Sequence, residues 1–486
     1  MLVSPRADSP PDVIVVGSGP NGLTAAVLLA RAGLQVRVIE VAEKPGGGCR
    51  SAAVTLPGFV HDLCSAVHPM GVLSPVFRDI GLEKFGLTWV PSNLPLAHPL
   101  PDGRVAVLEK SLATTAAALG RDGPAWSSML RPFATESFIH ALLQPVWHLS
   151  GASLIRKARF GLIGLRSAEH IARSRFHDDA TRALFAGCAA HSVVDLSHAG
   201  TAAFGLVLAA AAHVIDWPCA RGGSRAITQA LVRALQQAGG TLQLETRVSR
   251  LSELPDARAV LFDVSPRQVA QICGEALPAG YRKRLQAFRH GPGVFKVDWA
   301  LRAPIPWRNA ECHRAMTVHV CGAFEDVLQS EAEAWSGRIP TQPFVLLAQQ
   351  STFDPQRAPA GQHTGWAYCH VPNGCTENMT DRVEAQIERF APGFRDCILA
   401  RYSTGPAQLE AYNPAMIGGD MAGGANDLGQ FLMRPVPRFN PYATPNPRVF
   451  ICSSSTPPGG GVHGMCGYHA ARTVLRHVFG RSAKSK

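Results

Sequence analysis

Short apolar runs alternate with glycine-rich turns and amphipathic segments near both ends of the chain. Residues 12–16 form a run rich in β-branched side chains, which is typical of a strand buried on both faces of a parallel sheet. Residues 23–32 are rich in Ala and Leu and predict a helix, and Gly33 can supply its left-handed end. Leu34, Val36 and Val38 then predict a second strand, which ends at Glu40.

The same alternation returns later in the chain. A turn at residues 222–224 precedes a segment whose apolar positions fall on one helical face, with Ser224 as a candidate N-cap. Alternating residues 242–245 predict a strand. Residues 449–452 predict a buried strand, 453–464 a loop and 465–478 a helix. This order predicts an α/β fold in which a parallel sheet is covered by helices.

The turn between the first strand and helix has the spacing of a dinucleotide-binding fingerprint. Gly17 permits a tight turn, Gly19 lets backbone approach a pyrophosphate, and Gly22 lets the helix pack close to the strand. Pro20 and Asn21 lie inside this turn, where free N–H groups of the helix face phosphates. Glu40 follows Gly22 by 18 residues and is placed to accept hydrogen bonds from an adenosine ribose.

A second glycine-rich loop starts six residues after this acid. Gly46, Gly47 and Gly48 would let backbone approach a longer cofactor whose flavin end must also be held, which favours FAD over NAD. A plain surface turn is the alternative. Arg50 follows the loop and is a candidate phosphate ligand.

These stretches resemble one known group of enzymes. They are similar to the FAD-dependent oxidoreductases that include phytoene dehydrogenase and the carotenoid desaturases, isomerases and ketolases, and more distantly to the amine oxidases. The similar stretches are residues 12–40, 57–69, 221–251, 291–307 and 455–472. The likeness is weakest between about residues 76 and 200. It implies an FAD cofactor, a Rossmann-type FAD-binding domain and an α+β substrate or cap domain.

The resemblance also assigns residues and domains. It implies that backbone at Val248 meets the adenine and that Val462, Gly464 and Met465 are backbone neighbours of the flavin ring. We infer that residues 1–75, 213–300 and 440–486 build one discontinuous FAD-binding domain. Residues 76–212 and 301–439 would then form a substrate or cap domain.

Charge, cysteine spacing and the length of apolar runs limit which partners and which compartment we expect. The 486 residues carry 47 basic and 36 acidic side chains, a net charge of +11, yet no basic run is interleaved with aromatic residues, so we expect no nucleic-acid partner. The twelve Cys contain no CxxC pair, which argues against a zinc site or a redox dithiol, and we expect no metal. The longest apolar run, 202–212, is too short to span a bilayer, and residues 1–12 have no signal-peptide pattern; we expect a cytoplasmic protein.

Residues 151–176 carry six basic residues and one acid among apolar ones. They predict a basic amphipathic segment, either a solvated helix or a peripheral contact with an anionic membrane. Residues 418–424 form another glycine-rich stretch, either an approach to substrate or flavin or a surface loop.

These observations predict an FAD-dependent oxidoreductase that transfers hydride from a small apolar substrate, polyisoprenoid or carotenoid-like, to flavin. No second nucleotide fingerprint is present, so the electron acceptor stays open among oxygen, a quinone and another acceptor, and a redox-neutral isomerisation is an alternative. His463 is the candidate catalytic residue, as a proton carrier or a structural histidine, whereas Asp62 and His68 are expected to be structural. The alternatives are a regulatory or structural flavin-binding protein and an amine oxidase.

Overall fold

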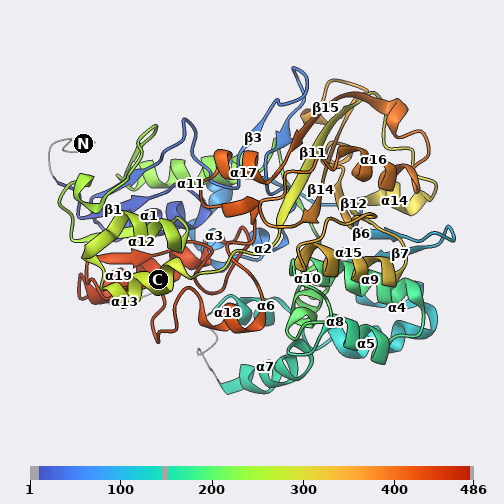
Figure 1. The fold of residues 1–486 in the computed structure, drawn as a ribbon, viewed down its shortest axis with the longest axis horizontal. Helices are drawn as coiled ribbons and strands as arrows, with labels where there is room; N and C mark the ends of the chain where they lie inside the picture. The colour runs from blue at the N-terminus through green and yellow to red at the C-terminus, as the bar shows by residue number, and fades with distance from the viewer. Residues whose placement is uncertain (1–9, 145–150, 482–486) are drawn as a thin grey trace.

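The computed structural model describes residues 10–144 and 151–481, with the backbone alone for residues 151–153. The prediction that no signal peptide is present rests largely on residues 1–9, which lie outside the described residues. Figure 1 shows two lobes side by side, one around a parallel sheet and one around a larger mixed sheet.

The first lobe is built on a five-stranded parallel sheet. Its strands, in spatial order, are β16 (Val449–Ile451), β10 (Ala259–Phe262), β1 (Val13–Val16), β2 (Val36–Ile39) and β9 (Thr241–Gln243). The predicted strands at 12–16, 34–40 and 449–452 are therefore confirmed, and the fold class with them. The strand predicted at 242–245 is also present, but it ends at Gln243, before Glu245, whose φ is +53°. Because segments from the start, middle and end of the chain pair here, the sheet joins distant parts of the sequence.

Helices cover both faces of this sheet because successive side chains of a strand point to opposite sides. Val13 and Val15 pack against the first helical layer, and Ile14 and Val16 against the second. The first layer contains α1 (Pro20–Arg31), α11 (Arg225–Gln237) and α19 (Met465–His477), and the second contains α12 (Pro266–Cys273) and α13 (Ala279–Gln286). Helix α1 begins three residues before the predicted start, with Pro20 in its first turn.

Ser224 precedes α11, but its side chain does not cap the helix as predicted. Its backbone N–H donates instead to the buried Asp62 carboxylate at 2.7 Å, so the charge that meets this helix end comes from another part of the chain.

The second lobe is built on a seven-stranded mixed sheet. Its order is β15 (Ile398–Thr404), β11 (Gly293–Leu301), β14 (His363–Val371), β13 (Val345–Ala348), β12 (Ala315–Val320), β6 (Leu94–Pro99) and β7 (Val105–Leu108). Only β12 and β6 pair in parallel. The predicted domain boundary at residue 300 falls inside β11, which belongs to this sheet; the division into two domains stays a prediction.

The outer face of the mixed sheet carries α14 (Ala310–Arg314) and α16 (Thr380–Glu388), and its inner face meets a layer of helices (Figure 1). That layer comprises α4 (Leu112–Ala118), α5 (Gly123–Leu130), α6 (Glu136–Leu142), α7 (Gly151–Gly164), α8 (Ala168–Arg175), α9 (Asp179–Ala190), α10 (Thr201–Ile215) and α15 (Phe324–Trp335).

Short elements connect the two lobes. They are β3 (Ser51–Ala52), β4 (His61–Asp62), α2 (Pro69–Val72), α3 (Pro75–Ile80), β5 (Trp89–Val90), β8 (Cys219–Ala220), α17 (Pro406–Tyr412) and α18 (Leu428–Met433). Across residues 10–144 and 151–481, no helix has both the length and the apolar character needed to cross a membrane.

Candidate active site

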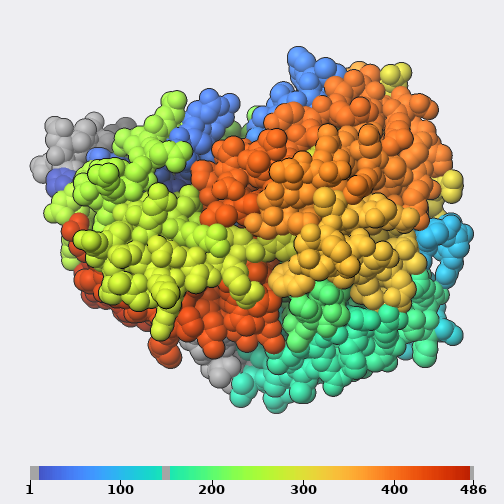
Figure 2. Space-filling model, in the orientation of Figure 1, coloured from blue at the N-terminus to red at the C-terminus, as the bar shows by residue number. Residues whose placement is uncertain are grey.

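A large cavity of about 860 Å³ runs between the two lobes. One end is lined by the first glycine-rich turn and Glu40, and the other by the mixed sheet and the helices α7, α10 and α18. Figure 2 shows the N-terminal, central and C-terminal segments of the first lobe lying side by side, which is how residues so distant in sequence come to share one wall.

The first turn is shaped by close backbone packing. Gly17 has φ of +100°, a conformation that favours glycine. A methyl group on Gly22 would lie 2.4 Å from the Gly17 carbonyl oxygen, and one on Gly19 would lie 2.6 Å from the Asp263 carboxylate. Gly17 and Gly19 line the cavity with Pro20 and Asn21, whereas Gly22 is buried behind them as the contact between helix and strand.

Glu40 ties this turn to the end of β2. Its carboxylate accepts hydrogen bonds from the backbone N–H of Ser18 at 2.9 Å, the Ser18 hydroxyl at 2.6 Å and the Ala42 N–H at 3.0 Å. Arg50 lies 3.5 Å from the same carboxylate. Glu40 lines the cavity, so it both fixes the turn and presents negative charge to a ligand.

The second glycine-rich loop packs directly on the first. A methyl group on Gly47, which has φ of +52°, would lie 3.0 Å from the Cα atom of Gly19. The Tyr412 hydroxyl donates to the Gly47 carbonyl at 2.8 Å, and Gly48 lies beside Cys64. Both predicted glycines line the cavity, so the two loops form one continuous wall.

Two buried polar atoms on this wall have no hydrogen-bond partner among the described residues: Asn21 Oδ1 and Arg50 Nε. Arg50 also donates to the Tyr412 carbonyl at 3.2 Å. Val248 lines the same end of the cavity next to Arg247. A helix N-terminus, a carboxylate, an arginine and unpaired polar atoms fit a dinucleotide.

Asp263 is a site residue that sequence reasoning missed. Its carboxylate accepts a hydrogen bond from the Gly22 N–H at 2.8 Å, at the N-terminus of α1. Loss of solvent around this carboxyl raises its pKa to about 8, which leaves it largely protonated at neutral pH and removes a charge that would repel phosphates. The available signal was its position directly after the buried strand β10, at the carboxyl edge of the parallel sheet.

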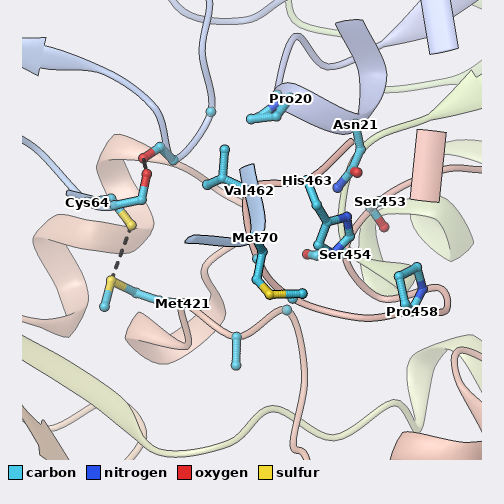
Figure 3. A pocket seen from close by; sticks show the side chains of 18 of the residues that line it. Pro20, Asn21, Cys64, Met70, Met421, Ser453, Ser454, Pro458, Val462 and His463 are labelled. Atoms are coloured by element: carbon cyan, nitrogen blue, oxygen red, sulfur yellow. Dashed lines mark hydrogen bonds between the residues drawn. The ribbon is translucent and has the colours of Figure 1, made fainter. Parts of the chain in front are cut away.

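The loop before α19 completes the wall. Figure 3 shows Val462 and His463 next to Pro20 and Asn21, so residues from opposite ends of the chain meet at the cavity. Gly464 and Met465 do not line it. A methyl group on Gly464 would lie 2.5 Å from the Thr24 hydroxyl, so this glycine allows the C-terminal helix to approach α1.

His463 is held by its own loop. Its Nδ1 accepts a hydrogen bond from the Met465 N–H at 3.0 Å, and the Ser74 hydroxyl donates to its carbonyl at 2.6 Å. Burial lowers the pKa of the ring to about 4, so it is neutral at physiological pH. A role in proton transfer stays a prediction.

Asp62 lies in a buried ionic network between the lobes. Arg357 donates to it at 2.6 Å and the Ser51 hydroxyl at 2.7 Å, and the Arg357 side chain also reaches Asp354 and the Ala220 carbonyl. These contacts tie residues from distant parts of the chain together, and a purely structural role for Asp62 stays a prediction. His68 lines the cavity, and burial lowers its pKa to about 4.

The rest of the cavity is mainly apolar. Helices α7, α10 and α18 and the turn after α7 contribute apolar side chains: Phe160, Leu165, Phe204, Val207, Leu208, Phe431 and Leu432. From residues 418–424, Asp420, Met421, Ala422 and Gly423 also line it, and the Cys64 thiol donates to the Met421 sulfur at 3.2 Å (Figure 3). All twelve cysteines are free thiols, and the described residues contain no cluster of potential metal ligands.

Strand β14 adds an aromatic pair to this wall. Trp366 and Tyr368 lie two positions apart on the same strand face, with ring centroids 5.3 Å apart. The buried Lys296, paired with Asp298, lies 5.6 Å from the centre of the Trp366 ring. Sequence reasoning found no such pair, because the local pattern of a strand does not reveal which face meets a cavity.

Comparisons with known proteins agree with this architecture. Residues 15–80 match the NAD(P)-binding Rossmann-like domain. The chain is 27% identical to pyridine nucleotide-disulfide oxidoreductase domain-containing protein 2 of Mus musculus, over 96% of this chain and 94% of that protein. It is 26% identical to phytoene dehydrogenase of Streptomyces griseus, over 80% and 77%.

Solved structures share the fold. An oxidoreductase from Methanosarcina mazei superposes with a TM-score of 0.64 at 15% identity, covering 96% of this chain and 99% of that one. Putrescine oxidase bound to putrescine gives 0.61 at 16% identity, covering 97% and 99%. The predicted resemblance is therefore confirmed, and these homologues and structural neighbours include named oxidoreductases.

Proposed function

We propose that this protein, an oxidoreductase of the FAD/NAD(P)-binding superfamily related to phytoene dehydrogenase and amine oxidases, binds FAD and oxidises an apolar substrate. The observation that carries the proposal is the large cavity, which runs from Glu40 past Val462 to an apolar wall of helices. FAD would supply a hydride acceptor, which is the chemistry this substrate class needs.

The chain's own groups would bind the cofactor in an extended form. The turn at residues 17–22 and the N-terminus of α1 would hold the pyrophosphate, and Glu40 the ribose. Backbone at Val248 would lie against the adenine, and backbone at Val462 against the flavin end. Gly47, Gly48 and Arg50 would close the wall between them.

The apolar helices would orient the substrate and exclude water. Abstraction of hydride from an apolar carbon depends mainly on positioning next to the flavin, so a side-chain base is not required.

The aromatic pair Trp366 and Tyr368 favours a second candidate, amine oxidation, because aromatic faces attract cationic ligands. The same experiment separates the candidates. Protein reconstituted with FAD is mixed anaerobically with carotenoid, terpenoid, lipid and amine panels, and loss of visible flavin absorbance is recorded.

Reduction by apolar compounds alone supports the proposal, and reduction by amines alone supports the second candidate. Protein that retains flavin but is reduced by no compound favours a regulatory or structural role. Protein that binds no flavin after reconstitution contradicts both enzymatic proposals.

We also propose that the cavity opens toward an anionic lipid surface. Leu165 and Leu432 line the cavity and are 53% and 42% exposed, so they mark its mouth. On the outer side of α7, Ile155 is 81% exposed and Leu162 is 73% exposed, with Arg159 between them in sequence. Apolar side chains flanked by basic ones suit the interface of an anionic bilayer.

The test is co-sedimentation with phosphatidylserine-containing vesicles and with neutral vesicles at low salt. Wild type should bind the anionic vesicles, and a variant with Ile155→Ser and Leu162→Ser should lose most of that binding. Leu399→Ser, at an exposed position of β15, is the matched control and should bind like wild type. Absence of wild-type binding would remove this proposal without affecting the proposal of FAD binding.

A further inference from the structure

The inner face of the mixed sheet lines part of the cavity. Because side chains alternate along a strand, Trp366, Tyr368 and His370 of β14 share one face, while Ala367 and Cys369 pack into the core on the other. All three inward residues line the cavity. His370 is the last of them, at the end of the strand.

His370 forms a buried pair with Glu331 of α15. The ring Nδ1 lies 2.8 Å and 2.9 Å from the two carboxylate oxygens, and the residues are 1% and 2% exposed. A carboxylate only accepts hydrogen bonds, so Nδ1 carries the proton and donates. The pair fixes the ring through Nδ1 and leaves the second nitrogen, Nε2, outside this contact.

Nε2 of His370 has no hydrogen-bond partner in the part of the chain that the structure describes. The ring stacks on Phe344 at 6.3 Å, meets the Tyr368 ring at 5.6 Å and lies within electrostatic range of His191, which lines the same cavity. A buried polar atom without a partner is costly, so this nitrogen points to a polar group on a ligand.

We propose that the substrate is an apolar molecule bearing a hydroxyl group, and that this hydroxyl binds His370 Nε2. A neutral ring accepts a hydrogen bond from the hydroxyl, and a protonated ring donates one to it, so a hydroxyl satisfies Nε2 in either state. Glu331 acts as a positioning residue that holds the ring. This inference rests on the proposed function only in taking the cavity as the substrate site.

The probes are geraniol and the hydrocarbon myrcene, which have similar size and differ by the hydroxyl. Binding is followed by the fluorescence of Trp217 and Trp366, which line the cavity, in FAD-reconstituted protein. The measured quantity is the ratio of the two dissociation constants. It needs no turnover, so it is independent of flavin reduction.

Replacing His370 alone would leave the Glu331 carboxylate buried without its partner and would destabilise the fold. The main variant is therefore the double substitution Glu331→Met with His370→Phe, which replaces the pair by apolar side chains. We expect it to shift the ratio toward myrcene by about tenfold or more. Glu331→Gln keeps an acceptor for Nδ1 and should shift the ratio by less.

Thr317→Val is the matched control. Thr317 of β12 also lines the cavity, and its hydroxyl has no partner among the described residues. Strand β13 separates it from β14: Thr317 pairs with Ala348, which pairs with Trp366, four residues before His370. It should leave the ratio unchanged.

An unchanged ratio in the folded double variant, or a shift in the Thr317 variant alone, would overturn the proposal. If the protein binds no FAD, the ratio is measured on the protein without cofactor; a shift of the ratio there would count against the proposed function and leave this inference standing.

Discussion

Gly19 offers the sharpest test of the dinucleotide site, because it lines the cavity and is packed against Asp263. A methyl group added in Gly19→Ala would lie 2.6 Å from the nearer Asp263 carboxylate oxygen, less than any real carbon contact. The backbone of Gly19 has φ of −66°, which alanine adopts freely. The substitution therefore perturbs the ligand wall without straining the main chain.

The size of the expected loss of FAD affinity follows from the displacement of the Asp263 side chain. The Asp263 side chain has to rotate, which breaks its 2.8 Å hydrogen bond to the Gly22 N–H at the start of α1. Loss of that bond costs about 1–3 kcal/mol. The displaced carboxyl and the new methyl group both intrude on the place assigned to the pyrophosphate. We expect FAD affinity to fall by about 30- to 1,000-fold, which corresponds to about 2–4 kcal/mol.

The assay is titration of apoprotein with FAD, followed by flavin fluorescence, with thermal unfolding as a second reading because a bound ligand raises stability. Gly161→Ala is the matched control. Gly161 lines the same cavity from α7 and has open space around an added methyl group, so it should keep wild-type affinity. A folded Gly19→Ala protein that binds FAD within about threefold of wild type would refute the assignment of this turn to the cofactor.

Three further predictions concern the framework around the site. Arg357→Met leaves the buried Asp62 carboxylate without its cation and should cost about 3–5 kcal/mol in urea unfolding, and adding Asp62→Asn should restore much of that loss; a single variant as stable as wild type would contradict this. Burial lowers the pKa of His98 from 6.5 to about 4, so the unfolded state binds a proton more readily than the folded state. The free energy of unfolding should therefore fall by about 3 kcal/mol for this residue as the pH drops from 6.5 to 4. His98→Gln should flatten that pH dependence, and an unaltered slope would argue against this reasoning. Gly467→Ala places a methyl group 1.9 Å from a backbone oxygen of α1 and should lower the free energy of unfolding by more than about 3 kcal/mol, measured by thermal unfolding. In the control Gly429→Ala the methyl group lies 3.5 Å from its nearest neighbour, so stability should not change. Equal effects of the two substitutions would be inconsistent with close packing of α1 against α19.

Much of the first lobe was predictable from local pattern. The run at 13–16, the glycine spacing and the acid at Glu40 are features of neighbouring residues, and they determine a strand, a turn and a helix wherever the segment folds. The C-terminal helix was predicted in the same way.

Other parts depend on contacts between distant residues. Nothing in the sequence around β11 indicates which sheet it joins, because a buried strand looks the same in both. Likewise, the contact of Gly47 with Gly19 depends on how two separate loops pack.

The sequence by itself therefore determined the nucleotide-binding elements of this protein, because their side-chain periodicity and backbone freedom are local properties. Only the tertiary structure decided that Asp263 sits at the start of α1, that Trp366 and Tyr368 face the cavity, and that Glu331 and His370 pair. The physical reason is that burial, desolvation and hydrogen-bond pairing arise between elements, and no pattern within one element specifies the partner that another will bring.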